Sequence, residues 1–391
     1  MILGKKFKKL VKKPQFFLIL ILIILIIYTF KIENLREKFS DNIWYKIFKR
    51  YYEFNGEYYD DANPKYILYE CVELCGGWAD RLKGLFSIYA WSLITKRNFR
   101  IYLTHPCNLE SLVKPNKIKW NSPMIHNGID IQKSKKFTTS HLDFIDDLDF
   151  KKNIQFIDIN EIESQTNLLV VNDNQDWTYG ISRNDYLSEQ IKNLGYEDQE
   201  KFNLVHLFRD WFKNMFNLSD QLEIKYEAIK KQFDLKNNKV VCAQIRIGGA
   251  RPNVAFDYQY NSRNVTQLFW NFIREKFLSQ IEDDNYKIFI TTDLESVYKE
   301  AEIEFGIDSM IHIPGLYTHI DREQYLKDNC ERVDKTVLDF YFFENCDYVL
   351  ISNSGFGKLG SLRKKDPFKN AFILKNDQFQ ELTEDILIGN L

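Results

Sequence analysis

The C-terminal half of the sequence contains two groups of residues whose types and spacing suit the binding of a phosphate. The stretch 347–360 reads as an apolar strand that breaks at Ser352, Ser354 and several glycines before a helix begins. Such a turn leaves backbone N–H groups free at a helix N-terminus, where the partial positive charge favours a phosphate. A second apolar strand, upstream, ends at Arg246 and is followed by two glycines. A guanidinium and an amide-rich turn at two strand ends predict a site for the diphosphate of a nucleotide.

The elements expected around these residues alternate between strands and helices. Strand 66–72 leads through a glycine-rich turn into helix 78–96, and strand 99–103 follows, which predicts a parallel βαβ unit. This alternation favours an α/β fold of doubly wound parallel sheets, with ligands at the carboxyl ends of the strands. We expect two Rossmann-like domains that face a cleft, an acceptor-side domain over 63–235 and a donor-nucleotide domain over 236–391. The other expected strands are 155–159, 167–171, 239–247, 286–292, 309–313, 347–352 and 371–374, and the other expected helices are 205–216, 221–233, 264–281, 294–305, 334–345 and one from 355 onward.

The N-terminus has the pattern of a membrane anchor. Residues 1–13 carry a cluster of lysines, and a run without charges follows over 14–30. As a helix this run reaches roughly 25 Å, close to the thinner ER-type bilayer of about 27 Å. The lysines favour a cytoplasmic tail, so the sequence predicts a single-pass type II protein of the Golgi or ER membrane, with a stem at 31–62 and a lumenal catalytic domain. A cleaved signal peptide is the alternative, although no small-x-small cleavage site follows Phe30.

Bulk composition excludes several classes of protein. The formal net charge is −2 and no basic patch dominates, so nucleic acid is not an expected partner. Aromatic residues at 15% in a chain with 28% charged residues indicate a folded globule. The six cysteines fit an oxidising lumen. Cys242 lies in an apolar strand and is expected to be a buried free thiol, which would leave an odd number. Sequons at Asn217 and Asn264 permit N-glycosylation.

Three segments resemble motifs of the GT-B fucosyltransferase superfamily, which holds α1,2-, α1,6- and protein O-fucosyltransferases. The segment Gly76-Gly-Trp-Ala-Asp-Arg-Leu-Lys-Gly84 resembles the glycine-rich strand-to-helix turn near the start of those catalytic domains. The segment Gln244-Ile-Arg-Ile-Gly-Gly249 is similar to the His-x-Arg motif that follows the first strand of the donor domain. The segment Ile351-Ser-Asn-Ser-Gly-Phe-Gly357 resembles the turn that contacts the donor phosphates. Together these matches span roughly residues 70–360.

The resemblance implies that the chain uses GDP-fucose as its donor and needs no further cofactor. In that family the arginine at the position of Arg246 grips the diphosphate, and Asp293 fits a lesser element near the guanosine. This sequence departs from the family at two positions, because Gln244 replaces the usual histidine and Ile247 stands where many branches carry a second arginine. Arg246 would then act alone or with Arg251. The donor-binding residues implied are Gly76, Gly77, Arg246, Asp293, Ser352, Ser354, Gly355 and Phe356.

Transfer of a sugar from a nucleotide requires that the leaving diphosphate be neutralised and that the acceptor hydroxyl lose its proton. Arg246 suits the first role, because its planar guanidinium stays protonated and binds two phosphate oxygens. Inversion at the sugar carbon favours a carboxylate base near the acceptor hydroxyl. The candidates are Asp80 and Asp257, with Glu70 and Glu73 as further possibilities. Asp257 is preferred because it lies in the loop after Arg246.

The sequence therefore predicts an inverting glycosyltransferase that moves fucose from GDP-fucose to a hydroxyl of a glycan or glycoprotein. No metal is expected, because Asp147-Leu-Asp149, although formally an Asp-x-Asp signature, lies in an acidic run typical of a solvated loop. The alternative function is a membrane-tethered, catalytically inactive glycan-binding relative, which the departures at Gln244 and Ile247 support. A lumenal sulfotransferase is a weaker alternative, because the turn at 76–80 lacks the Lys/Arg–Ser/Thr ending of a phosphate-binding loop.

Overall fold

A computed structural model describes residues 64–162, 164–249, 257–281, 285–321, 330–388 and 390–391. These residues all belong to one compact unit, Asn55–Leu391. The predicted cytoplasmic tail, anchor and stem lie outside the described residues, as does Arg251. Among the helices of the described part, none combines the length and the apolar character that crossing a bilayer requires.

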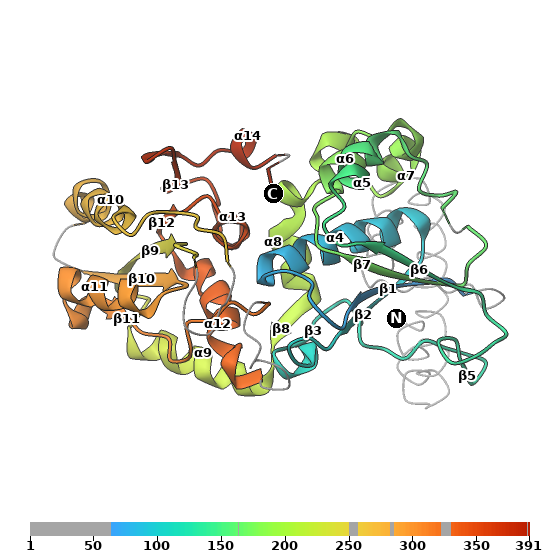
Figure 1. The fold of residues 1–391 in the computed structure, drawn as a ribbon, viewed down its shortest axis with the longest axis horizontal. Helices are drawn as coiled ribbons and strands as arrows, with labels where there is room; N and C mark the ends of the chain where they lie inside the picture. Colours follow the sequence, from blue (N-terminus) through green and yellow to red (C-terminus); the bar gives the residue numbers. More distant parts are fainter. Residues whose placement is uncertain (1–63, 163, 250–256, 282–284, 322–329, 389) are drawn as a thin grey trace, which may run out of the picture. The chain divides into compact units, whose positions relative to one another are not determined.

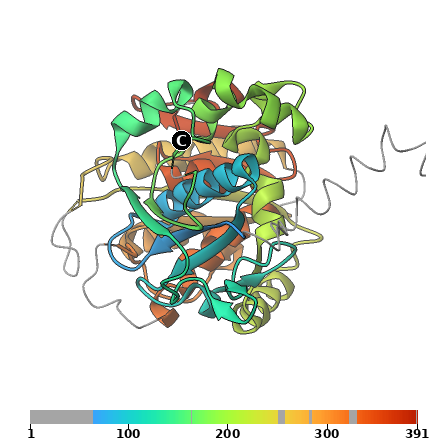
Figure 2. The same ribbon diagram turned by 90° about the vertical axis from the view of Figure 1, so that its right-hand side faces the viewer.

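The N-terminal half, residues 64–235, is built on a parallel sheet of four strands (Figure 1). Its order is β2-β1-β7-β6, and every pair of neighbouring strands is parallel. Helix α4 (Trp78–Thr95) connects β1 to β2 and lies across the sheet, as Figure 2 also shows. The strands are β1 (Tyr66–Cys71), β2 (Asn98–Leu103), β6 (Thr139–Phe144) and β7 (Leu168–Asp173).

Helix α4 approaches the sheet so closely that a glycine is required at its contact with β7. A Cβ atom on Gly84 would lie 2.0 Å from the carbonyl oxygen of Asp173, the last residue of β7. Almost the whole length of α4 is buried, because the sheet covers one side and helix α8 (Leu204–Met215) packs on another. The start of this helix, which carries Gly77 and Asp80, is therefore fixed relative to the sheet.

The C-terminal half, residues 236–391, contains a sheet of six strands in the order β11-β10-β9-β12-β13-β14, parallel except for β14. From β9 the chain proceeds to β10 and β11 on one side, and β12 and β13 continue on the other side. The direction of winding therefore reverses between β9 and β12, and at such a switch point the loops after the two strands diverge and leave a crevice. The strands are β9 (Lys239–Ile245), β10 (Tyr286–Thr292), β11 (Met310–Ile311), β12 (Tyr348–Ile351), β13 (Ala371–Lys375) and β14 (Gln378–Glu381).

Alternating side chains of β9 point into two different cores, as the two-residue period of a strand requires. Val241, Ala243 and Ile245 pack under helices α10 (Val265–Phe272) and α11 (Glu295–Phe305). Val240 and Cys242 join a larger core that includes residues of both sheets and of helices α12 (Asp334–Phe342) and α13 (Gly355–Ser361). Both faces of this strand are buried, which explains its continuous apolar sequence.

The remaining elements are β3 (Val113–Pro115), β4 (Ile125–His126), β5 (Ile129–Asp130), β8 (Phe216–Leu218), α5 (Leu148–Asn153), α6 (Thr178–Ser182), α7 (Ser188–Asn193), α9 (Asp220–Gln232) and α14 (Glu384–Leu387).

Most predicted elements are confirmed, but the strand predicted at 155–159 is wrong. That segment contains a short 3-10 turn, and the side-chain amide of Asn184 donates hydrogen bonds to the carbonyls of Ile154 (2.6 Å) and Ile157 (2.7 Å). These carbonyls therefore need no partner strand. The edge strands β6 and β14 carry largely polar sequences, and the sequence pattern did not predict them. The helix predicted over 264–281 remains α-helical only to Phe272 and continues as a π-turn and a 3-10 turn.

The expectation of a free thiol at Cys242 is wrong. Cys242, on β9, forms a disulfide with Cys346, which lies just before the neighbouring strand β12, and their Cα atoms are 5.8 Å apart. The other disulfides are Cys71–Cys75 and Cys107–Cys330, so all six cysteines are paired. The Cys107–Cys330 disulfide links the N-terminal half covalently to the C-terminal half. The pairing of β9 with β12, which the sequence pattern does not reveal, is what brings Cys242 to its partner.

Candidate functional site

A cavity of about 230 Å³ lies where the carboxyl ends of β9, β10 and β12 face the start of α4. Arg246 and Gln244 line it from β9, and the turn Ser354–Phe356 lines it from the start of α13. Gly77 and Asp80 contribute the opposite wall. The two segments expected to bind a diphosphate therefore contribute to one cavity, at the point where the winding of the sheet reverses.

The guanidinium of Arg246 is held by two buried carboxylates. Its Nη1 donates to Asp293 Oδ2 at 2.5 Å, and its Nη2 donates to Asp257 Oδ2 at 2.6 Å. One face of the guanidinium lies over the ring of Tyr260, with 4.9 Å from Cζ to the ring centroid. Two of the five N–H groups of an arginine are thus used by protein carboxylates. The other three form no hydrogen bond with any residue that the structure describes, and Arg246 lines the cavity.

The geometry gives Asp257 and Asp293 a positioning role. The Asp257 side chain is 3% exposed, is not among the residues that line the cavity, and pairs with Arg246. Asp293 also accepts hydrogen bonds from the backbone N–H groups of Ile247 (2.9 Å) and Gly248 (2.8 Å). Asp293 therefore fixes the loop that follows β9 as well as the guanidinium. The N-cap residue of α11 is Leu294 and not Asp293.

The serine turn after β12 is ordered by hydrogen bonds to β9. The Ser352 hydroxyl accepts a hydrogen bond from the backbone N–H of Arg246 (3.0 Å), and Ser352 is buried outside the cavity lining. The Ser354 hydroxyl donates to Gln244 Oε1 (2.9 Å) and accepts from the N–H of Gly357 (3.3 Å). The backbone N–H groups of Gly355 and Phe356 have no acceptor within the helix, as is general for a first turn. An anion in the cavity would therefore meet backbone amides rather than the serine protons.

The start of α4 forms the facing wall through Gly77 and Asp80. The Asp80 carboxylate accepts from the N–H of Gly77 (3.1 Å) and pairs with Lys83 (2.8 Å). Gly76 adopts φ +84°, and a Cβ atom there would lie 2.9 Å from Cβ of Asp80, so the turn requires glycine at this position. Gly76 shapes the turn without lining the cavity. A Cβ atom on Gly77 would lie 3.5 Å from Asp80 Oδ2 and 3.9 Å from the imidazole of His319, which also lines the cavity.

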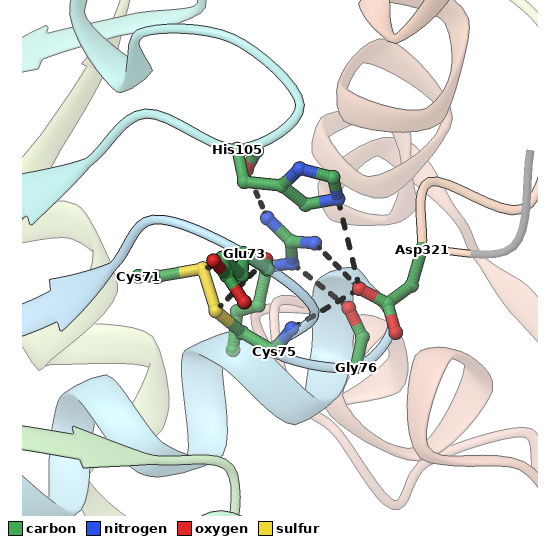
Figure 3. Close-up of a disulfide and its surroundings, with 7 residues drawn as sticks. Cys71, Glu73, Cys75, Gly76, His105 and Asp321 are labelled. Carbon is green, nitrogen blue, oxygen red and sulfur yellow. Dashed lines mark hydrogen bonds and ion pairs between the residues drawn. A yellow bond between two sulfur atoms is a disulfide. The ribbon is translucent and has the colours of Figure 1, made fainter. Parts of the chain in front are cut away.

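A buried ion pair connects this wall to the C-terminal half, and Figure 3 shows its acid, Asp321, close to Cys75 of the Cys71–Cys75 disulfide. Arg81 donates from Nη2 to Asp321 Oδ1 at 3.1 Å and from Nε to the carbonyl of Gly76 at 2.8 Å. The same Asp321 oxygen accepts from the backbone N–H of Cys75 at 3.1 Å. Burial lowers the pKa of Arg81, which is only 1% exposed, but the adjacent carboxylate keeps it charged. Arg81 is thus a residue that positions the glycine turn rather than a ligand.

Several residues of the cavity were not found from the sequence. The segment 316–320 and the helix α12 residues Lys335 and Asp339 line it. Lys335 Nζ lies 3.0 and 3.1 Å from the two Asp339 oxygens, and the Thr291 hydroxyl donates to Asp339 at 2.8 Å. Burial raises the pKa of Asp339. No motif marks these residues, because the sequence of α12 is that of an ordinary apolar helix and the segment 316–320 has no periodic pattern.

The remaining predicted candidates lie elsewhere. Glu70 and Glu73 do not line the cavity. Asp147 caps helix α5 by accepting from the N–H of Phe150 (2.8 Å), and Asp149 is an exposed partner of Lys152 (3.8 Å). Within the described residues there is no group of three or more His, Cys, Asp or Glu side chains that could hold a metal ion.

Comparison with known proteins gives matches at the level of structure. No protein-family model matches the sequence, and no curated protein matches it. A mutant of the fucosyltransferase FUT1 of Arabidopsis thaliana, in complex with GDP, superposes with a TM-score of 0.57 at 12% identity, over 88% of this chain and 78% of that one. The NodZ alpha-1,6-fucosyltransferase soaked with GDP-fucose superposes with a TM-score of 0.50 at 13% identity, over 82% of this chain and 99% of that one.

The chain has a GT-B fucosyltransferase-like fold. A second structure of NodZ, the selenomethionine form from Bradyrhizobium, agrees with a TM-score of 0.50 at 12% identity, over 82% of this chain and 98% of that one. At identities this low, the superpositions establish that the helices and strands have a common arrangement. The predicted α/β fold of parallel sheets is confirmed.

Proposed function

We propose that the protein is an inverting glycosyltransferase that transfers fucose from GDP-fucose to a hydroxyl of a glycan or glycoprotein. One observation carries the proposal: Arg246 and the turn Ser354–Phe356, from two adjacent strands, line a single cavity at the switch point of the sheet. A fold shared with proteins whose structures hold GDP or GDP-fucose supports the choice of nucleotide. We further propose that residues 236–391 bind the donor and residues 63–235 bind the acceptor.

The leaving group of this reaction is GDP, whose diphosphate gains negative charge as the bond to fucose breaks. The three N–H groups of Arg246 that bind no described residue, and the amides of Gly355 and Phe356, would meet that charge. Donors fixed in advance stabilise a developing charge without having to reorganise during the reaction. The carboxylates of Asp257 and Asp293 provide that fixation. The departure at Ile247 is consistent with Arg246 acting alone, because the Ile247 side chain is buried in the core.

The acceptor hydroxyl also needs a base, and the structure favours Asp80 over Asp257. Asp80 lines the cavity on the wall opposite Arg246, and its side chain is 41% exposed. Gly77 also lines the cavity, and a Cβ atom there would lie 3.5 Å from Asp80 Oδ2 and 3.9 Å from the imidazole of His319. A hydroxyl placed there would reach the Asp80 carboxylate, so we assign the base to Asp80 and place the acceptor at Gly77.

For localisation we propose a type II membrane protein of the Golgi or ER with a lumenal catalytic part. The support is the lysine-flanked apolar run 14–30 in the sequence and the pairing of all six cysteines. Disulfides form and persist in oxidising compartments. Surface labelling of the full-length chain in intact and opened microsomes would place the domain, and protease access in intact microsomes would contradict a lumenal position.

Calorimetry with GDP and measurement of GDP release from GDP-fucose test the donor assignment. We expect the full-length chain to bind GDP, to release GDP from GDP-fucose when an acceptor is supplied, and to do so in the presence of a chelator. Absence of a heat of binding at millimolar GDP would contradict the assignment of a donor site. GDP binding without turnover on any acceptor of a glycan panel would instead favour the inactive glycan-binding relative. Activity that a chelator abolishes and manganese restores would contradict metal independence.

A further inference from the structure

A second cavity, of about 410 Å³, is lined by residues of helices α8, α9 and α12 and of strand β8, and by Glu344, Arg363 and Lys365. Its floor is aromatic and contains one fixed cation. The guanidinium carbon of Arg363 lies 4.3 Å from the ring centroid of Phe212 and 4.3 Å from that of Tyr341. All three residues are buried. The floor therefore carries a positive charge that is held rigidly between two rings.

The charges that line this cavity do not balance. Its three acids are already paired: Glu344 with Arg363 (3.0 Å), Glu227 with Lys230 (2.5 Å) and Glu223 with Lys114 (3.2 Å), which lies outside the cavity. Three further cations line the cavity and form no ion pair with any described residue. They are Arg209, Lys213 and Lys365. The cavity thus has an excess of positive charge and no acid left to neutralise it.

The floor also contains polar atoms that lack partners. The hydroxyl of Tyr341 and Nε of Arg363 are buried and have no hydrogen-bond partner among the described residues. At the rim, the Glu223 and Glu227 side chains are 54% and 60% exposed and accept hydrogen bonds. Cations, aromatic rings and exposed acceptors in one cavity match a ligand that has an acid group, an apolar ring face and several hydroxyls.

We propose that this second cavity binds an anionic saccharide, namely a sugar that carries a phosphate or sulfate ester. The ester would lie against Arg209, Lys213 and Lys365, and the sugar hydroxyls would face the rim carboxylates. The site is separate from the donor cavity but shares helix α12 with it. Lys335 and Asp339 of this helix line the donor cavity, whereas Tyr341, about 9 Å further along the helix axis than Lys335, lines the second cavity.

Titration calorimetry on the full-length chain tests this proposal. The probes are the 6-phosphate and the 6-sulfate of N-acetylglucosamine, with N-acetylglucosamine as the neutral control. We expect at least one ester to bind, and the Lys213→Gln, Lys365→Gln double variant to bind it roughly 5- to 30-fold more weakly, as expected for the loss of two exposed charge contacts. Lys231→Gln is the matched control, because Lys231 is an exposed residue of α9 outside the cavity. Its affinity should equal that of the wild type.

Four results would overturn the proposal. These are equal affinity for the neutral sugar, unchanged affinity in the double variant, displacement of the ester by GDP, and binding of inorganic phosphate or sulfate as tight as that of the esters. The third would place the ester in the donor cavity, and the fourth would show a site for a bare anion. The two esters, compared with each other, identify which acid group the cavity prefers. Both substituted lysines are exposed, so matched thermal unfolding of wild type and variants confirms that folding is intact.

Discussion

The hydroxyl of Ser354 donates a 2.9 Å hydrogen bond to the side-chain carbonyl of Gln244. This bond joins the carboxyl end of β12 to the carboxyl end of β9 inside the candidate donor site. Gln244 occupies the position at which the family that this sequence resembles has a histidine. In the structure its side chain accepts the hydrogen bond from Ser354. It is 4% exposed and orients the turn whose amides face the cavity. The departure therefore does not by itself indicate a decayed site.

A double-mutant cycle on these two residues should show coupling. We expect Gln244→Leu and Ser354→Ala each to weaken GDP binding by about 2- to 13-fold, the range for one net hydrogen bond of about 0.5–1.5 kcal/mol. The double variant should lose less than the sum of the two single losses, because both remove the same bond. Calorimetry measures the four affinities. Strict additivity would mean that the bond does not contribute to the nucleotide site.

Arg246→Ala should lower turnover by about 30- to 4000-fold while the protein remains folded. This range corresponds to about 2–5 kcal/mol for truncating one member of a buried charge pair. Arg246→Lys keeps the charge but loses the bidentate contact with Asp257 and Asp293. Its activity should therefore fall between that of the wild type and that of Arg246→Ala. Arg263→Ala, which removes a partly exposed arginine paired with Glu300, is the control. Release of GDP from GDP-fucose is the measurement, and full activity in a folded Arg246→Ala variant would exclude its role.

Two neighbouring glycines of α13 should respond differently to alanine. A Cβ atom on Gly357 would lie 2.5 Å from Gln244 Oε1 and 2.9 Å from Cβ of Ile351, whereas one on Gly355 would make its closest contact at 3.4 Å, with Ala79. Gly357→Ala should destabilise the fold by about 1–3 kcal/mol, the usual cost of overpacking. Gly355→Ala should be close to neutral in denaturant unfolding. Equal stability of the two variants would contradict the packing described at Gln244.

The disulfides should differ in their contribution to stability. Cys107–Cys330 joins residues 223 positions apart, whereas Cys71–Cys75 joins residues 4 apart. Because a cross-link restricts the unfolded chain more when it closes a longer loop, Cys107→Ser with Cys330→Ser should cost about 3 kcal/mol more than Cys71→Ser with Cys75→Ser. Chemical unfolding of the two double variants tests this. A larger loss from the short-range pair would show that loop length does not decide the contribution of these disulfides.

Lys358 should make stability depend on alkaline pH. Burial, together with Lys83 and Lys151, lowers its pKa from 10.5 to about 8 in the folded protein. Between these values the unfolded chain holds the proton that the folded chain has released. The free energy of unfolding should therefore rise as pH increases from about 8 toward 10, by at most about 1.4 kcal/mol per pH unit. Lys358→Met should reduce this increase of the free energy of unfolding with pH. The same slope in the variant would show that other groups cause the increase.

The sequence was sufficient to predict the alternating α/β architecture and the meeting of Arg246 with the serine turn. Both follow from physical rules that act locally: apolar strands alternate with amphipathic helices, and the carboxyl ends of parallel strands lie at one edge of a sheet. Ser352 and Ser354 could therefore be placed near Arg246 without knowledge of the full topology. Their separate tasks, one holding the Arg246 backbone and the other bonded to Gln244, depend on side-chain geometry that the pattern does not contain.

The features that the sequence did not reveal depend on long-range contacts. Asp257 was preferred as the base from its closeness in sequence to Arg246, and the structure adds that the two side chains form a buried ion pair. The identity of the base stays a prediction. Cys242 looked like a core thiol because its partner, Cys346, becomes a neighbour only when β9 pairs with β12. His319 carried no signal at all, since it lies in an irregular segment that the N-terminal half meets only in the folded protein.

The covalent link between Cys107 and Cys330 has a consequence for the way the two halves meet around the cavity. The disulfide keeps the N-terminal and C-terminal halves at a high effective concentration relative to each other. Their docking therefore costs little translational entropy. Non-covalent contacts between the two halves, such as that of Arg81 with Asp321, therefore determine the orientation of the halves, while the disulfide keeps them together. Loss of that ion pair should therefore misalign the glycine turn while the molecule stays in one piece.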